Sequence, residues 1–306
     1  MSAIPLGQIT GSKPQLDKFQ AVWLSHSSIS DFLACPRGYF LKNIYKDPQT
    51  RHKIQQITPA LALGQIIHEV VEGLSQLPTD TRFKKSLLVS LKERWPKVAG
   101  IKGGFTSAEQ EQRFFERGEK MLSKIMENPG PLTKLSVKLK AELPYYWLSE
   151  SEELILCGKL DWLEYLAETD SVHIIDFKTS KSEEKTESLQ LPIYYLLAKN
   201  CQKRPVVKAS YWYLEFGDGL TEKSLPNPGE ATAQLLKIGK EMKLARRLER
   251  FRCPNGIGGC QTCQPLERII RGEGQLIGVS AATRRDIYVL PYSSLGKPSD
   301  DESVIL

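Results

Sequence analysis

Apolar residues recur at the three- and four-residue spacing of a helix face through much of the first 130 positions. Ser27 or Ser28 suits the cap of a helix whose apolar stripe follows directly behind. Further helices are expected over residues 59–76, 82–97 and 107–127. The pattern therefore predicts a mostly helical region, preceded by an irregular or extended arm over residues 1–24.

The pattern changes after a break that contains two prolines and a glycine, residues 128–131. Apolar and polar residues then alternate in places, and short apolar runs are bounded by turn residues, as is typical of strands. Strands are expected within 135–148 and over 154–165, 171–178 and 206–216, with more strand after about residue 272. Helices are expected over 189–200 and 230–251. Helices followed by a small mixed sheet with an inserted helix predict the α/β class.

This order divides the chain into four expected segments. A mostly helical N-terminal region spans 1–130, and a core of sheet and helices spans 131–250. A Gly- and Cys-rich segment follows over 251–275. The remainder, 276–306, is expected to be an extension that ends in a disordered acidic tail over 293–306.

Composition excludes a membrane protein and leaves nucleic acid open as a partner. No apolar run approaches the roughly 20 residues of a membrane-spanning helix, and residues 1–15 lack a signal pattern. We therefore expect a cytoplasmic protein. The formal net charge is +6, and residues 237–252 hold seven Lys or Arg against two Glu. Such a stretch suits a polyanion such as nucleic acid, and a solvated helix face is an equally good interpretation.

Two charged residues, Asp176 and Lys178, stand in the otherwise apolar run 171–178. Residues two apart on a strand point to the same face, so the two side chains project together. A second acidic residue, Asp161, ends a Gly-x-x-Asp motif in the preceding β-rich run. Carboxylates on adjacent strands suit a hard divalent cation. A lone Asp-x-Lys pair is commonly just a solvated pair, but a charge within such apolar strands favours chemistry.

These motifs resemble the RecB-type branch of the PD-(D/E)xK nuclease superfamily. Gly158-Lys-Leu-Asp161, Asp176-Phe-Lys178-Thr and Gln190-Leu-Pro-Ile-Tyr194 have that family's order and spacing. The family includes nuclease domains of bacterial recombination helicase-nucleases and CRISPR-associated four-cysteine nucleases. The resemblance covers about residues 24–272. It implies a restriction-endonuclease-like core, in which a small mixed central sheet is flanked by helices.

The resemblance also implies a role for several residues. Asp161 and Asp176 would bind Mg²⁺ or Mn²⁺ together with the backbone carbonyl of Phe177, and Lys178 would be the catalytic lysine. His68 matches the place of the family's histidine metal ligand, although a lone His on a helix is ordinarily a core residue.

The same resemblance gives Gln190 and Tyr194 a positioning role. They are four residues apart, hence on one helix face, and would help to position the lysine or the DNA. Packing of Tyr194 into the core is the alternative interpretation.

Six cysteines occur, and three of them fall within eleven residues near the C-terminus, which indicates a metal or cluster before a redox role. Four resemble the iron–sulfur arrangement of the same family, one early and three late: Cys35, Cys253, Cys260 and Cys263. Four thiolates suit a [4Fe–4S] cluster, which we favour, or structural Zn²⁺. The late spacing departs from the family, because Cys253 precedes the Cys-x-x-Cys pair. Cys157 and Cys201 are interpreted as ordinary buried thiols.

The function expected from the resemblance is metal-dependent hydrolysis of DNA phosphodiester bonds, exonuclease-like on single-stranded ends. The alternative is a non-catalytic DNA-binding or scaffold subunit of a repair or CRISPR-type complex. The intact set of Asp161, Asp176, Lys178 and His68 favours the enzyme. No nucleotide-binding Gly-x-x-x-x-Gly-Lys-Ser/Thr motif is present, so any unwinding would come from a partner such as a helicase.

Overall fold

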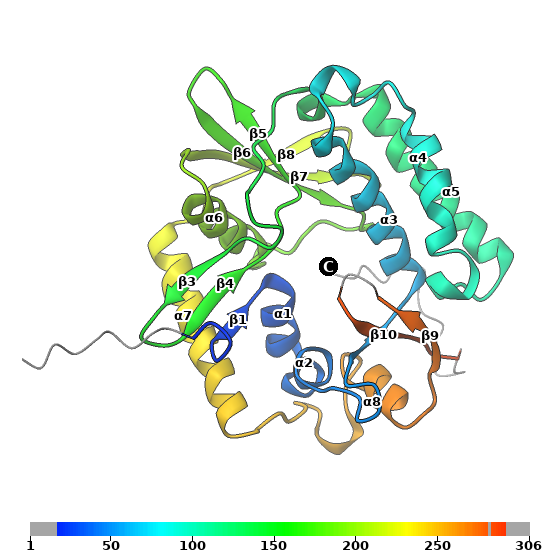
Figure 1. Cartoon of the computed structure of the whole chain (residues 1–306), viewed down its shortest axis with the longest axis vertical. Helices are drawn as coiled ribbons and strands as arrows, with labels where there is room; N and C mark the ends of the chain where they lie inside the picture. The colour runs from blue at the N-terminus through cyan, green and yellow to red at the C-terminus, as the bar shows by residue number, and fades with distance from the viewer. Residues whose placement is uncertain (1–16, 281–282, 292–306) are drawn as a thin grey trace, which may run out of the picture.

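The computed structural model describes residues 17–280 and 283–291. The predicted acidic tail over 293–306 and most of the predicted arm over 1–24 lie outside the described residues. Within the described part, small mixed sheets are surrounded by helices (Figure 1), as the α/β prediction required. No helix among the described residues combines the length and the apolarity needed to cross a lipid bilayer.

The first third of the described chain is mainly helical, as predicted. Its helices are α1 (His26–Ala34), α2 (Pro36–Asn43), α3 (Pro59–Gly73), α4 (Leu87–Arg94) and α5 (Ala108–Glu127). The helix expected over 82–97 was predicted too long. It is the short α4, which Ser86 caps and which gives way to a 3-10 turn over Trp95–Lys97, because Pro96 has no N–H to continue an α-helix. Helices α4 and α5 lie beyond α3 at one side of the molecule (Figure 1).

A four-stranded sheet forms the centre of the fold. Its strands are β5 (Trp162–Leu166), β6 (Ser171–Lys178), β7 (Val206–Tyr213) and β8 (Leu220–Lys223), in that order. Strands β6 and β7 run parallel, whereas β5 and β8 are antiparallel to their neighbours. The parallel pair is joined through helix α6 (Gln190–Cys201), the helix predicted between two strands. All eight residues of β6 are buried, which explains its nearly continuous apolar sequence.

A second sheet has the order β1-β4-β3 and lies beside the first. It consists of β1 (Val22–Leu24), β3 (Tyr145–Ser149) and β4 (Leu154–Cys157). The strand expected within 135–148 is found only at its end, in β3. The run expected over 154–165 divides into β4 and β5, because residues 158–161 leave the strand conformation.

A third sheet joins segments that are far apart in the sequence. Strand β10 (Arg285–Val289) lies between β2 (Lys53–Gln56), to which it is parallel, and β9 (Gln275–Val279). The strand predicted after residue 272 is thereby confirmed. Helix α8 (Gln264–Ile270) packs against α2 and β2. The division into four segments stays a prediction, and β10 connects the last of those segments to the first.

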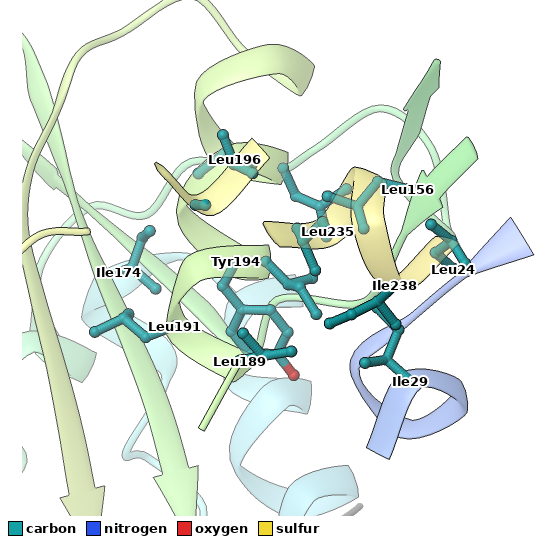
Figure 2. Packing of buried hydrophobic residues seen from close by; sticks show 14 of the residues in the cluster. Leu24, Ile29, Leu156, Ile174, Leu189, Leu191, Tyr194, Leu196, Leu235 and Ile238 are labelled. Carbon is teal, nitrogen blue, oxygen red and sulfur yellow. The ribbon is translucent and has the colours of Figure 1, made fainter. Parts of the chain in front are cut away.

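Alternate residues of β6 face two different hydrophobic cores. Ile174 packs in a core with α6, α7 (Pro228–Arg247), β1 and β4, where Tyr194 and Leu235 also lie (Figure 2). Ile175 and Phe177 pack on the other side of the sheet with α3 and α5. Because strand residues two apart share a face, Asp176 and Lys178 must emerge on the α6 side of the sheet.

Candidate active site

The C-terminal end of β6 carries the two charged residues that the sequence singled out. Asp176 is 2% exposed and Lys178 is 9% exposed, so both are held away from bulk solvent. The Lys178 ammonium lies 3.1 Å from Asp176 Oδ2. Burial of such a pair costs free energy unless other groups complete its polar contacts.

Helix α6 supplies those contacts from its first turn. The Gln190 amide nitrogen donates hydrogen bonds to Asp176 Oδ1 at 3.1 Å and to the Tyr194 hydroxyl at 3.2 Å. The Gln190 side-chain oxygen accepts a hydrogen bond from the Lys178 ammonium. Both residues predicted to position the lysine therefore lie in one buried hydrogen-bond chain, and Tyr194 also packs in the core, as the alternative interpretation held.

Asp161 reaches the same region from the irregular stretch between β4 and β5. Its Oδ2 accepts a hydrogen bond of 2.9 Å from the backbone N–H of Phe177, which ties it to the end of β6. Its Oδ1 is directed to helix α3, where it lies 3.5 Å from His68 Nδ1. The structure thus brings Asp161 and His68 to the β6 pair. Phe177 also lines the cavity, and the roles of these residues as metal ligands stay predictions.

Two carboxylates in the site were not predicted. Glu72 lies one turn after His68 on α3, with its Oε1 3.5 Å from His68 Nδ1. Glu184, in the loop before α6, lies 2.9 Å from the Lys178 ammonium. The spacing of four residues from His68 is a signal that could have identified Glu72, whereas the loop sequence around Glu184 carries no periodic pattern.

Burial and neighbouring charges shift the pKa values at the site in opposite directions. Burial raises the pKa of Asp176 to about 7. Burial also acts to raise the pKa of Asp161, but the adjacent His68 outweighs it and the pKa is lowered. For His68, burial acts to lower the pKa, while the Asp161 carboxylate raises it to about 10. The site therefore carries an excess of acidic groups that a cation would stabilise.

The donor set fits a hard divalent cation. Asp176 Oδ2 is buried, and the positive group beside it is the Lys178 ammonium at 3.1 Å. Ligand atoms of His68, Glu72 and Asp161 lie within 4.8 Å of one another. Carboxylate oxygens are preferred ligands of Mg²⁺ and Mn²⁺, and imidazole nitrogen is a ligand of many divalent cations, so these residues are a suitable donor set.

These residues line one cavity of about 770 Å³. The cavity is also lined by the start of α1, Ser25–Ser27, by Thr283 and by Arg285, the first residue of β10. In Figure 1, α1, α3 and α6 lie around the middle of the molecule, with β9 and β10 on the side opposite α6. The basic residues of α7 do not line this cavity, and Lys240 and Lys243 are paired with Glu152 and Glu153 at 2.8 Å.

The four predicted cysteines form a second group, and none of them lines the cavity. Cys35 connects α1 to α2, and its sulfur accepts a hydrogen bond of 3.3 Å from the Gly38 N–H. The sulfur atoms of all four lie within 4.8 Å of one another, among them Cys260 and Cys263 at 3.8 Å. Cys157 and Cys201 are outside the group, as expected.

The cysteine group fits a metal centre. Burial raises the pKa of Cys35 to about 12, whereas for Cys260 burial is outweighed by hydrogen bonds from the backbone of Cys263 and Thr262, which lower the pKa to about 6. Four thiolates at about 2.3 Å from one tetrahedral ion are about 3.8 Å apart, the observed Cys260–Cys263 spacing. A [4Fe–4S] cluster needs a wider separation of its four thiolates. The glycine-rich stretch 254–259 is mostly exposed, and its movement would let Cys253 and Cys260 move apart to bind such a cluster.

Comparison with known proteins agrees with this geometry. The family model described as "PD-(D/E)XK nuclease superfamily" matches residues 23–267. A solved structure, that of a "Putative exonuclease" from Eubacterium rectale, is 12% identical with a TM-score of 0.46 and covers 92% of this chain and 97% of its own. No curated protein matches the sequence. Because the family model spans most of its length, the chain belongs to the PD-(D/E)XK nuclease superfamily.

Proposed function

We propose that this protein is a Mg²⁺- or Mn²⁺-dependent deoxyribonuclease of the RecB-type branch that degrades DNA from single-stranded ends. The observation that carries the proposal is the convergence of Asp161, Asp176 and Lys178 in one cavity, from the β4–β5 stretch and the end of β6. A nuclease that had lost its activity could replace the whole buried Asp–Lys pair by apolar residues, because such a pair adds little stability over an apolar pair of similar volume.

Each residue has a distinct part in the proposed reaction. Water attacks phosphorus, and the new P–O bond forms as the bond to the leaving sugar oxygen breaks and that oxygen takes up a proton. A cation held by His68, Asp161 and Asp176 would activate the water and neutralise charge on the phosphate. The Lys178 ammonium holds the water or a phosphate oxygen, and Gln190 fixes that ammonium in place.

We take single-stranded ends as the substrate from the family resemblance. A cavity of about 770 Å³ has room for unpaired nucleotides beside Asp176 and Lys178. Where the DNA is double-stranded, a partner such as a helicase would separate the strands. Arg285 and Lys185 on the cavity wall are cations suited to the phosphates of a bound strand.

The test is digestion of end-labelled single- and double-stranded DNA, linear and circular, with Mg²⁺, Mn²⁺ or EDTA. We expect the wild type to shorten linear single strands with either cation and to leave circles intact. Asp176→Asn and Lys178→Ala should each lower the rate by at least about a hundredfold while DNA binding persists. Lys208→Ala is the matched control, because Lys208 lies on the adjacent strand β7 and pairs with Glu222 outside the cavity.

Two results would contradict the proposal. Undiminished cleavage by Asp176→Asn would remove the site assignment, and binding without cleavage by the wild type would favour the alternative of a non-catalytic DNA-binding subunit. Cleavage of circular DNA, which has no ends, would assign endonuclease activity in place of the proposed exonuclease activity.

For the cysteine group we propose a [4Fe–4S] cluster that joins α1 and α2 to the segment 253–263. The resemblance supports iron, and the sulfur spacing supports the zinc alternative. Anaerobically purified protein should be brown and hold about four irons per chain, as the cluster requires. A colourless protein with one tightly bound zinc would assign the zinc alternative instead.

A further inference from the structure

Helix α3 places a second potential ligand beside His68. His68 and Glu72 are four residues apart, so both side chains project from one face of the helix. Their side chains are both 17% exposed, and that of Asp161, which meets them from the β4–β5 stretch, is 8% exposed. Ligand atoms of the three residues lie within 4.8 Å of one another.

The spacing in this group suits metal ligation better than hydrogen bonding. His68 Nδ1 lies 3.5 Å both from Glu72 Oε1 and from Asp161 Oδ1. Nitrogen–oxygen hydrogen bonds are normally about 2.7 to 3.2 Å long, so neither contact is a good one. Ligands at right angles around a cation, each about 2.1 Å from it, are about 3 Å apart, and wider angles increase that separation. The two separations of 3.5 Å from His68 therefore fit ligands of one cation at angles wider than a right angle.

The other oxygen of Glu72 is already engaged. Glu72 Oε2 pairs with the Lys159 ammonium, which fixes the carboxylate and leaves Oε1 directed to His68 and Asp161. Lys159 is largely exposed, and surface ion pairs contribute only about 0 to 1 kcal/mol, so this pair does not account for the position of Glu72 beside His68. A protonated His68 carries one positive charge against the two carboxylates beside it, whereas a divalent cation between the three groups would balance both.

We propose that Glu72 is a direct ligand of the divalent cation, and that it completes a three-residue face with His68 and Asp161. This inference builds on the proposed nuclease function and adds a ligand that the sequence motifs did not include. Helix α3 would then supply two ligands of the cation, His68 and Glu72. Lys159 is then a positioning residue, because it acts on the cation through Glu72.

The test measures binding of Mn²⁺ alone, without DNA, by calorimetry on the full chain. Glu72→Gln keeps the shape of the side chain and removes its charge, and we expect Mn²⁺ affinity to fall by at least about tenfold. Glu69→Gln is the matched control, because Glu69 lies on the same helix and pairs with Lys97. Thermal unfolding of both variants in EDTA establishes that each is folded.

Pulsed electron paramagnetic resonance of bound Mn²⁺ separates ligation from positioning. If Glu72 is a ligand, saturated Glu72→Gln protein keeps the nitrogen coupling of His68, and His68→Ala abolishes that coupling. Wild-type Mn²⁺ affinity in Glu72→Gln would overturn the proposal. Loss of both the Mn²⁺ affinity and the nitrogen coupling would also overturn it, because Glu72 would then act only through His68. Failure of the nuclease proposal is seen separately, as unchanged DNA cleavage by Asp176→Asn.

Discussion

The cysteine group makes a quantitative prediction about stability. Cys35 and Cys253 are roughly 220 residues apart in the sequence, so a metal bound by both closes a very large loop. For a covalent crosslink, closing a loop of that length removes about 5 kcal/mol of conformational free energy from the unfolded chain. Cys35→Ala opens this loop, because it removes the sole ligand that the group takes from the N-terminal half.

Cys157→Ala is the matched control, since Cys157 is buried but lies outside the group. Both substitutions remove one buried sulfur, so the difference between them reports the crosslink. We expect the free energy of unfolding in anaerobic urea titrations to fall by about 5 kcal/mol more for Cys35→Ala than for Cys157→Ala. Stripping the metal from the wild type should remove most of that difference. Equal losses in the two variants would refute the idea that the group holds the fold together.

Three further predictions concern single residues. Arg82→Met should lower the free energy of unfolding by about 3 kcal/mol without affecting cleavage. The buried guanidinium donates hydrogen bonds to the carbonyls of Leu77 and Leu132, at 3.2 and 2.8 Å, and an unchanged urea midpoint would contradict the prediction. Gln190→Ala should lower the single-turnover cleavage rate about ten- to a hundredfold at unchanged DNA affinity, because Gln190 holds the Lys178 ammonium in place. Weaker DNA affinity at an unchanged cleavage rate would contradict this positioning role. The pKa of Asp176 is raised to about 7 and that of His68 to about 10, so a cation that binds both must displace a proton from each. Mn²⁺ affinity measured by calorimetry should rise with pH across this range, and Asp176→Asn should flatten the part of the rise below about pH 7.

The sequence predicted the centre of the fold better than its periphery. Strand β6 was predicted to the residue, because eight consecutive buried positions leave an unmistakable apolar run with its two charges at the end. The helices α3, α5 and α6 followed from equally regular apolar faces. The α7 helix was placed correctly, but the structure puts its basic residues away from the cavity, which charge counting alone had no means to show.

The missed elements are short or depend on distant partners. Strand β2 has four residues, two of them Gln, and exists because β10 pairs with it from the far end of the sequence. Glu72 was overlooked for a similar reason. The four-residue spacing from His68 places it on the same face of α3, but it becomes part of the site only through the path of Asp161 between β4 and β5, which that spacing does not report.

The pairing of β2 with β10 has a consequence for synthesis on the ribosome. A nascent chain of 250 residues already contains each residue proposed to bind the catalytic cation, from His68 to Asp176. It contains neither the three late cysteines nor Arg285 on the cavity wall, and its β2 edge has no strand beside it. Exposed strand edges invite pairing with other chains. The N-terminal elements α2 and β2 must therefore await the late segment before they reach their native contacts, and the cavity wall is completed only after Arg285 has been synthesised.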